Sequence, residues 1–103
     1  MAHGAGMFIV VDAVTSLGGM EIPVDRLGLD MVYSGSQKCL GCPPGLAPVT
    51  VGPRAVEHIR GRKTTVQRWY LDLTMLMRYS GQERFYHPTA PVTMIYGPNA
   101  GLK

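Results

Sequence analysis

The chain has 103 residues, which is close to the usual size of a single domain. Hydrophobic residues make up 46% and charged residues 17%, a balance typical of a globular protein whose strands are buried on both faces. No apolar run approaches the roughly 18 residues of a membrane span, and the first residues lack the charged segment of a signal peptide, so we expect neither a membrane partner nor secretion.

The basic residues are unevenly distributed. The formal net charge is +3, and five of the ten Lys and Arg residues lie between positions 54 and 68. Such a cluster is one signature of a nucleic-acid surface. No aromatic residue is interleaved with it before Trp69, so a solvated helix face and loop is the favoured interpretation. We therefore expect no nucleic-acid partner.

The first predicted strand is Met7–Val11, a continuous apolar run rich in β-branched residues and closed by Asp12. Its length and composition predict a central parallel strand. A carboxylate close to a core needs a partner, or it must lie at the open edge of the sheet. The small residues at positions 13–19 are typical of a loop that touches a ligand.

The next strand is predicted at residues 29–33, after a single helical turn within 21–29 that Asp25 is able to cap. It leads into Ser34-Gly35-Ser36-Gln37-Lys38. The interval from Asp12 to Lys38 is long enough for one crossover between parallel strands. Both residues are therefore expected at the carboxyl-end edge of the sheet, where α/β proteins bind ligands.

Lys38 is suited to form a Schiff base with a carbonyl cofactor, of which pyridoxal phosphate (PLP) is the usual one. It follows a strand predicted to be buried, and its small neighbours would let a ligand approach the backbone. The alternative is a solvated lysine in a turn, which is the commoner outcome for an arbitrary lysine after a strand. Lys38 and its loop alone leave both interpretations open.

Cys39 and Cys42 form a C-x-x-C pair directly after the lysine. This spacing occurs in redox pairs and in half of a zinc site. A second pair is missing, and the three histidines lie at no ligand-like spacing from the first, so no metal site is expected. Reduced thiols in a cytoplasmic protein are the favoured interpretation, with a peroxisomal or mitochondrial location left open.

The rest of the chain is predicted to form a strand at 46–51 and helices at 54–59, 70–77 and from Thr89 towards Asn99. Pro48 removes a ladder donor, which places its strand near an edge or at a bulge. Pro53 opens the first of these helices, and Thr89 is the expected N-cap of the last.

Several of these motifs together resemble one family. The Val-Asp strand end, the S-L-G-G loop, L-D-x-x-Y-S-G-S-Q-K and P-P-G resemble class V aminotransferases of the PLP-dependent fold-type I superfamily, especially the alanine–glyoxylate / serine–pyruvate branch. The resemblance continues through residues 62–64, 70–72 and 86–91, and so covers nearly the whole chain. It implies part of a three-layer α/β/α large domain, similar to that of aspartate aminotransferase, with a mainly parallel sheet.

The resemblance also implies residue roles. Lys38 would hold PLP as a Schiff base and carry a proton between substrate and cofactor. Asp12 would pair with the pyridine nitrogen, since an ionised carboxylate favours the protonated ring that accepts electrons. Val14 would pack against the ring, and Gln37 would donate a hydrogen bond to the cofactor phosphate.

Two further residues, Tyr86 and Thr89, resemble the pair that reaches the phosphate of the neighbouring subunit's cofactor, which implies a homodimer. A hydroxyl suits that role, and a helix N-terminus favours an anion near Thr89. A buried tyrosine and an ordinary helix cap would explain the same two residues.

The implied reaction moves an amino group from a small amino acid, alanine or serine, to the 2-oxo acid glyoxylate or pyruvate. One alternative is a cysteine desulfurase or lyase of the same family, but a histidine precedes the lysine there, whereas Gln37 stands here. Another is a non-catalytic fragment or a C-x-x-C thiol protein. The family's subunits are several times longer, so residues 1–103 are expected to be an internal part of the large domain, inactive alone.

Overall fold

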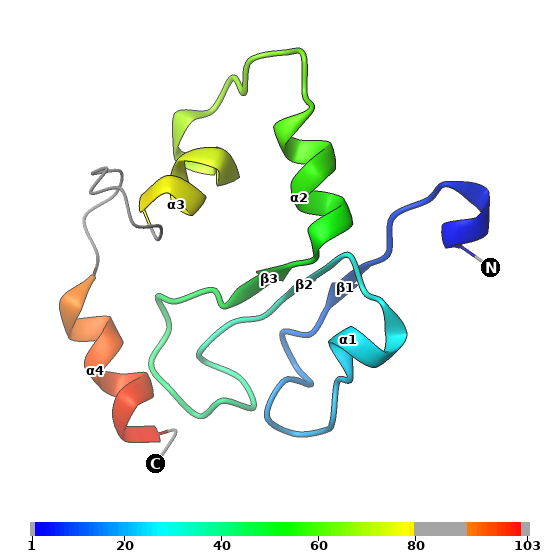
Figure 1. The fold of residues 1–103 in the computed structure, drawn as a ribbon. Coiled ribbons are helices and arrows are strands. Elements are labelled where there is room, and N and C mark those ends of the chain that lie inside the picture. Colours follow the sequence, from blue (N-terminus) through cyan, green and yellow to red (C-terminus); the bar gives the residue numbers. More distant parts are fainter. Residues whose placement is uncertain (1, 80–90, 102–103) are drawn as a thin grey trace.

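A computed structural model of the chain describes residues 2–79 and 91–101 (Figure 1). The strands are β1 (Val10–Asp12), β2 (Met31–Tyr33) and β3 (Val49–Val51). The α-helices are α1 (Val24–Leu27), α2 (Pro53–Arg60), α3 (Leu73–Tyr79) and α4 (Val92–Gly101). Two short 3-10 helices, η1 (His3–Ala5) and η2 (Trp69–Leu71), complete the described elements.

The three strands form one sheet in the order β1-β2-β3. β1 and β2 are parallel, with Asp12 opposite Tyr33, whereas β2 and β3 are antiparallel, with Tyr33 opposite Val49. The predicted α/β class is confirmed, and the sheet formed by the described strands is mixed. The sheet is mixed because its two connections differ. The connection from β1 to β2 contains α1 and returns the chain to the start of the sheet, so the two strands are parallel, whereas residues 34–48 join β2 to β3 without a helix and the two strands are antiparallel.

The outer strands are shorter than the sequence predicted. β1 begins only at Val10, and it lies at an edge of the described sheet rather than at its centre. The Ile9 carbonyl accepts hydrogen bonds from the amides of Asp30 and Met31, at 3.0 and 3.1 Å, so regular pairing starts after it. β3 lies at the opposite edge, as Pro48 predicted.

The helices largely follow the predicted pattern. α1 is a single turn, but Asp25 lies within it and does not cap it; Pro23 occupies the N-cap without a side-chain bond. α2 begins at Pro53, as expected. The segment predicted as one helix at 70–77 divides at Asp72, whose Oδ1 accepts a hydrogen bond from the Thr74 amide at 2.9 Å and so caps α3.

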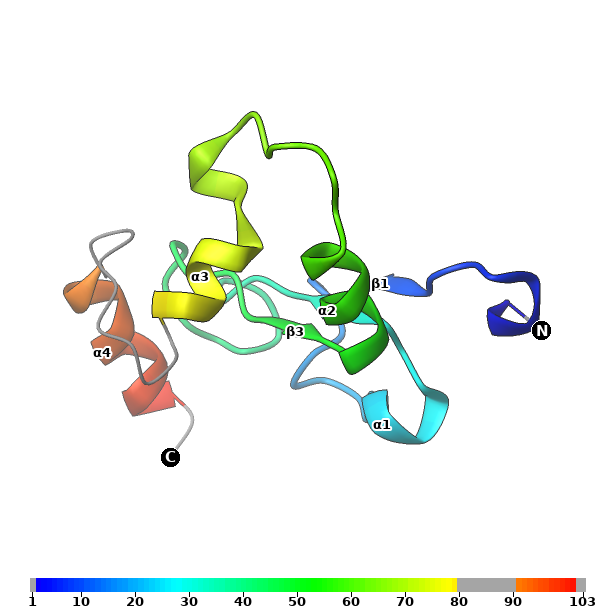
Figure 2. The ribbon, with the colours of Figure 1, turned by 45° about the horizontal axis from the view of Figure 1, so that its top comes forward.

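α2 and α3 lie over β3, and α1 lies on the other side of the sheet (Figure 2). Apolar side chains of the two helices face β3 across a cavity of about 330 Å³, lined in part by Val56, Ile59 and Leu76. The arrangement is therefore layered, with helices on both faces of a small sheet. None of the described helices is long and apolar enough to cross a membrane.

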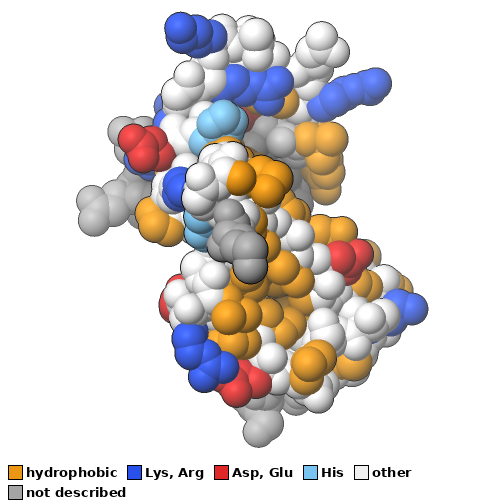
Figure 3. Space-filling model, turned by 90° about the vertical axis from the view of Figure 1, so that its right-hand side faces the viewer, with side chains coloured by type: hydrophobic (Ala, Val, Ile, Leu, Met, Phe, Trp, Pro, Cys, Tyr) orange, Lys and Arg blue, Asp and Glu red, His pale blue; other side chains and the backbone are white. Residues whose placement is uncertain are grey.

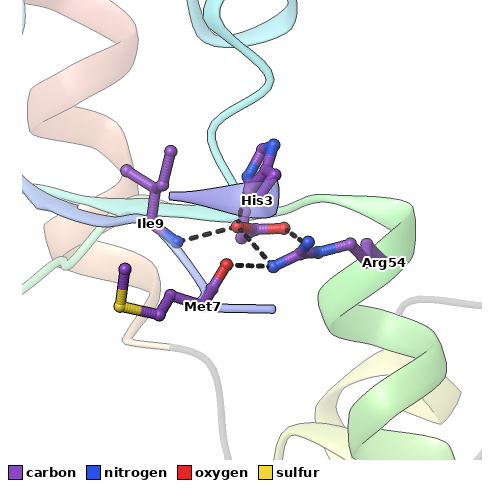
Figure 4. A network of polar contacts seen from close by, with 5 residues as sticks. His3, Met7, Ile9 and Arg54 are labelled. Atoms are coloured by element: carbon purple, nitrogen blue, oxygen red, sulfur yellow. Dashed lines mark hydrogen bonds and ion pairs between the residues drawn. The ribbon is translucent and has the colours of Figure 1, made fainter. Parts of the chain in front are cut away.

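A buried carboxylate anchors the amino end of β2 (Figure 4). Asp30 is 4% exposed. Its Oδ2 accepts a hydrogen bond from the Ile9 amide at 2.7 Å and contacts His3 Nε2 at 2.9 Å, while Arg54 Nε donates to Oδ1 at 3.0 Å. Arg54 also donates to the Met7 carbonyl. The Ile9 amide first, and then His3 and Arg54, hold the pKa of Asp30 below its ordinary value, against the effect of burial.

The apolar core of the described residues is small. Its buried apolar members are Ala13, Val32, Cys42 and Ala55. Large apolar side chains near β1 and α1 are exposed instead, and Figure 3 shows apolar surface gathered on this side of the molecule. The radius of gyration is 15.2 Å, larger than the roughly 13 Å of a compact domain of this length.

Candidate active site

The two residues singled out in the sequence follow neighbouring parallel strands. Asp12 is the last residue of β1, and the loop that carries Lys38 starts directly after β2. Because β1 and β2 are parallel, residues 13–20 and 34–48 leave the sheet at the same, carboxyl-end edge. This is the edge at which open α/β sheets bind ligands.

Hydrogen bonds join these two loops directly. The Ala13 amide donates to the Tyr33 carbonyl at 2.9 Å, and Ser34 Oγ donates back to the Ala13 carbonyl at 3.0 Å. Farther along, Cys39 Sγ donates to the Thr15 carbonyl at 3.0 Å. The loop after Asp12 and the loop around Lys38 are therefore held side by side.

The loop around Lys38 is also braced internally by its serines. The Ser36 amide donates to the Leu46 carbonyl at 3.0 Å, and its Oγ donates to the Pro43 carbonyl at 2.6 Å. Ser34 and Ser36 are 2% and 1% exposed. The sequence indicated only that small residues fit at these positions. The hydrogen bonds of Ser34 and Ser36 are made to carbonyls of residues farther along or back in the chain, so no local sequence pattern predicts them.

The glycines of the S-L-G-G loop pack against the loop around Lys38. Gly18 has φ +92° and lies against the lysine loop, where an added Cβ would stand 3.2 Å from the Leu40 side chain. An added Cβ at Gly19 would stand 3.1 Å from Cys39 Sγ. These glycines let the two loops pack closely.

Asp12 presents an exposed carboxylate at this edge. Its Oδ1 accepts a hydrogen bond from the Val14 amide at 2.9 Å, and its Oδ2 accepts one from the Tyr33 hydroxyl at 3.0 Å. That hydrogen bond, with smaller contributions from burial and the Asp12 charge, raises the pKa of Tyr33 above its ordinary value. Each carboxylate oxygen keeps acceptor capacity for one more donor.

Lys38 and Gln37 are both exposed beside this edge. The Lys38 ammonium forms no ion pair or side-chain hydrogen bond with any residue that the structure describes, and its carbonyl accepts from the Gly41 amide at 2.8 Å within a turn. The Gln37 side chain folds back over Gly35, where an added Cβ would lie 2.8 Å from its Oε1. Val14 is half-buried.

Tyr86 and Thr89 lie outside the described residues, so the structure does not test their predicted phosphate contacts. The two cysteines form no disulfide: Cys39 is exposed and Cys42 is buried, with its Sγ donating to the Leu40 carbonyl at 3.1 Å. No group of three metal-ligating side chains occurs within residues 2–79 and 91–101.

A PLP site suits the chemistry of this edge. The exposed carboxylate of Asp12 retains acceptor capacity that a protonated ring nitrogen would use, and the amine of Lys38 is available to an aldehyde. A larger cavity, of about 570 Å³, lies between the end of α2 and the start of α3, and none of the predicted site residues lines it. We place the candidate site at the sheet edge because its side chains supply the required chemistry.

Comparison with known proteins points to one family. The family "Aminotransferase class-V" matches residues 1–103. The chain is 43% identical over 98 residues to alanine–glyoxylate aminotransferase of Drosophila melanogaster, covering 92% of this chain and 25% of that protein. A crystal structure of the Nostoc sp. alanine–glyoxylate aminotransferase superposes with a TM-score of 0.93 at 46% identity, covering 98% of this chain and 27% of the other.

The name of a third relative indicates a different amino donor. The ureidoglycine–glyoxylate aminotransferase of Bacillus subtilis superposes with a TM-score of 0.92 at 35% identity, over 98% of this chain and 26% of the other. The protein belongs to the class V aminotransferase family, as its motifs predicted. The chain spans about a quarter of the length of these relatives.

Proposed function

We propose that this chain is a segment of a PLP-dependent aminotransferase that transfers an amino group from alanine or serine to glyoxylate or pyruvate. The supporting observation is the shared edge of β1 and β2, where the loops of Asp12 and Lys38 are joined by hydrogen bonds. Likeness to alanine–glyoxylate aminotransferases in sequence and in structure favours this reaction over others of the family.

In this proposal Lys38 has two roles at one amine. Its amine would hold the cofactor aldehyde covalently, with loss of water, and, once the substrate amino group has displaced it, the freed amine would move a proton at the α-carbon of the bound amino acid. PLP, when bound, supplies the electron-accepting ring. Asp12 holds negative charge beside the ring nitrogen, Val14 covers one ring face, and the Gln37 amide donates to the phosphate.

The partner-subunit contacts belong to the same proposal. Tyr86 and Thr89 would donate hydroxyl hydrogen bonds to the phosphate of the other subunit's cofactor, in a homodimer. Their support is the family motif in the sequence, residues 86–91. The two half-reactions would give ping-pong kinetics.

We further propose that residues 1–103 are one part of a larger PLP-binding domain. The small core and the exposed apolar side chains near β1 support this, because such surface is normally covered in a stable monomer. Within the described sheet, β1 also lies at an edge, so its backbone groups have no strand partner there on one side. The isolated chain is expected to be poorly stable and nearly inactive.

Cofactor trapping tests the site directly. The protein at its natural length is incubated with PLP, reduced with borohydride and digested, and the label is located by mass spectrometry. We expect it on Lys38, and we expect Lys38→Ala to lose it. Lys63→Ala is a suitable control because Lys63 is exposed and lies in the segment between α2 and η2. Equal labelling of wild type and Lys38→Ala would contradict the proposal.

An activity assay separates the two reactions of the family. Alanine with glyoxylate is expected to give pyruvate and glycine, whereas cysteine is expected to release no sulfide. Sulfide release without transamination would assign the protein to the desulfurases, and trapping without either activity would refute the proposed substrates while leaving the cofactor site in place.

A further inference from the structure

We propose that Tyr33 is a positioning residue that orients the Asp12 carboxylate towards the ring nitrogen of the cofactor. This inference rests on the proposed PLP site. It concerns a side chain that the sequence motifs assign to no role, at the end of the strand before the lysine loop.

The geometry places Tyr33 directly beside Asp12. The two residues are register partners at the carboxyl ends of β1 and β2, and the Tyr33 hydroxyl donates to Asp12 Oδ2 at 3.0 Å. The Val14 amide binds the other oxygen, Oδ1, at 2.9 Å. One donor on each oxygen fixes the plane of the carboxylate, which a single donor would leave free to rotate.

The supporting donors leave the carboxylate able to act. Each oxygen has a further acceptor site, so a ring N–H can bind without displacing Tyr33 or Val14. Supporting hydrogen bonds of this kind set the orientation of groups that contact a cofactor or metal. The hydrogen bond to Asp12 raises the pKa of the Tyr33 phenol, so the phenol keeps the proton that it donates.

Tyr33 is also well held for this purpose. Its carbonyl accepts from the Ala13 amide at 2.9 Å, and the next residue, Ser34, donates through Oγ to the Ala13 carbonyl at 3.0 Å. The backbone that carries the phenol is thereby attached to the backbone that follows Asp12. The Tyr33–Asp12 hydrogen bond thus joins two segments whose separation is already set.

The decisive experiment compares two cofactors in the apo-protein at its natural length. Binding of PLP and of its carbocyclic analogue 1-deaza-PLP, which lacks the ring nitrogen, is measured for wild type, Tyr33→Phe and Tyr79→Phe. We expect Tyr33→Phe to weaken PLP binding about tenfold and to change analogue binding less than about twofold. Tyr79→Phe, at the exposed end of α3, is expected to change neither.

The outcomes separate this inference from the proposed function. If wild type binds PLP on Lys38 but Tyr33→Phe weakens both ligands equally, or neither, Tyr33 does not act through the ring nitrogen and the inference is wrong. If wild type binds no PLP, both the inference and the proposed function are wrong. Circular dichroism of each variant excludes unfolding as the cause of a lost ligand.

A second measurement needs no cofactor and no deletion of the phenol. Tyr33 is replaced by 3-fluorotyrosine, and its ionisation is followed by fluorine NMR with and without the Asp12→Asn substitution. Loss of the carboxylate charge is expected to lower the phenol midpoint by at least about half a pH unit, because the neutral amide oxygen of Asn is a weaker acceptor. An unchanged midpoint would show that no such hydrogen bond exists, and would overturn the inference.

Discussion

Two carboxylates lie at opposite ends of the same pair of strands and have opposite surroundings. Asp30 precedes β2, is 4% exposed and is bound by the Ile9 amide, His3 and Arg54. Asp12 ends β1, is exposed and accepts one hydrogen bond on each oxygen. The Arg54 guanidinium is a cationic partner of the first carboxylate, whereas the described structure gives the second only neutral donors.

This difference separates a structural carboxylate from a functional one. Asp30 connects the N-terminal segment, β2 and α2, so its interactions contribute to folding. A buried charge with such partners is costly to disrupt. Asp12 retains acceptor capacity at the ligand-binding edge, so we expect its loss to affect chemistry more than stability.

The largest effect is expected from Asp12→Asn in the protein at its natural length. Removing the negative charge beside the cofactor nitrogen should lower kcat/KM for alanine and glyoxylate about hundredfold, because the protonated ring loses its counter-charge. The unfolding midpoint should stay within about 2 °C of wild type, since the site is exposed. Steady-state kinetics and thermal melts check both. Asp25→Asn, an exposed change in α1, is the control, and a stability loss without an activity loss would reverse the assignment.

The converse is expected of Asp30→Asn. His3 and Arg54 lose their charged partner, so the thermal unfolding midpoint should fall by roughly 5 °C or more. The kcat per folded molecule should change less than about threefold. Calorimetry and active-site titration with PLP measure these quantities. A melt that is the same as wild type would show that the Asp30 network contributes nothing to folding.

The pH dependence of stability sharpens the same comparison. The pKa of Asp30 in the folded state is lowered from its ordinary value of 3.8. The stabilising contribution of the Asp30 carboxylate is therefore fully present above pH 3.8 and is lost as the pH falls through the folded-state pKa. The difference in melting temperature between wild type and Asp30→Asn should therefore stay constant as the pH is lowered from about 6 towards 4, and it should shrink below pH 3.8. A difference that widens on acidification would contradict the lowered pKa.

The smallest effect is expected from Cys39→Ser. The serine hydroxyl can replace the thiol as the donor to the Thr15 carbonyl, so kcat/KM should change less than about twofold. A much larger loss would support thiol chemistry at the C-x-x-C pair. In a complementary measurement, a thiol reagent should label exposed Cys39 at least about tenfold faster than buried Cys42.

The sequence was most informative where the chemistry is local. Prolines located the start of α2 and the edge position of β3, and two strand ends predicted the shared edge of Asp12 and Lys38. It failed where partners come from afar. Neither the burial of Ser36 nor the hydrogen bond from the Tyr33 phenol to Asp12 has a local signal. A local error was the cap of α1, where Pro23 occupies the position that Asp25 was expected to fill.

The hydrogen bonds between the two loops have a consequence for motion. Because Ser34 and Cys39 bind carbonyls of the segment after Asp12, a displacement of either loop carries the other with it. Thermal fluctuation at this edge should then be concerted, and the separation of the Asp12 and Lys38 backbones should vary less than the position of either one. The three short strands of the described sheet can in this way carry two loops whose spacing is held by hydrogen bonds.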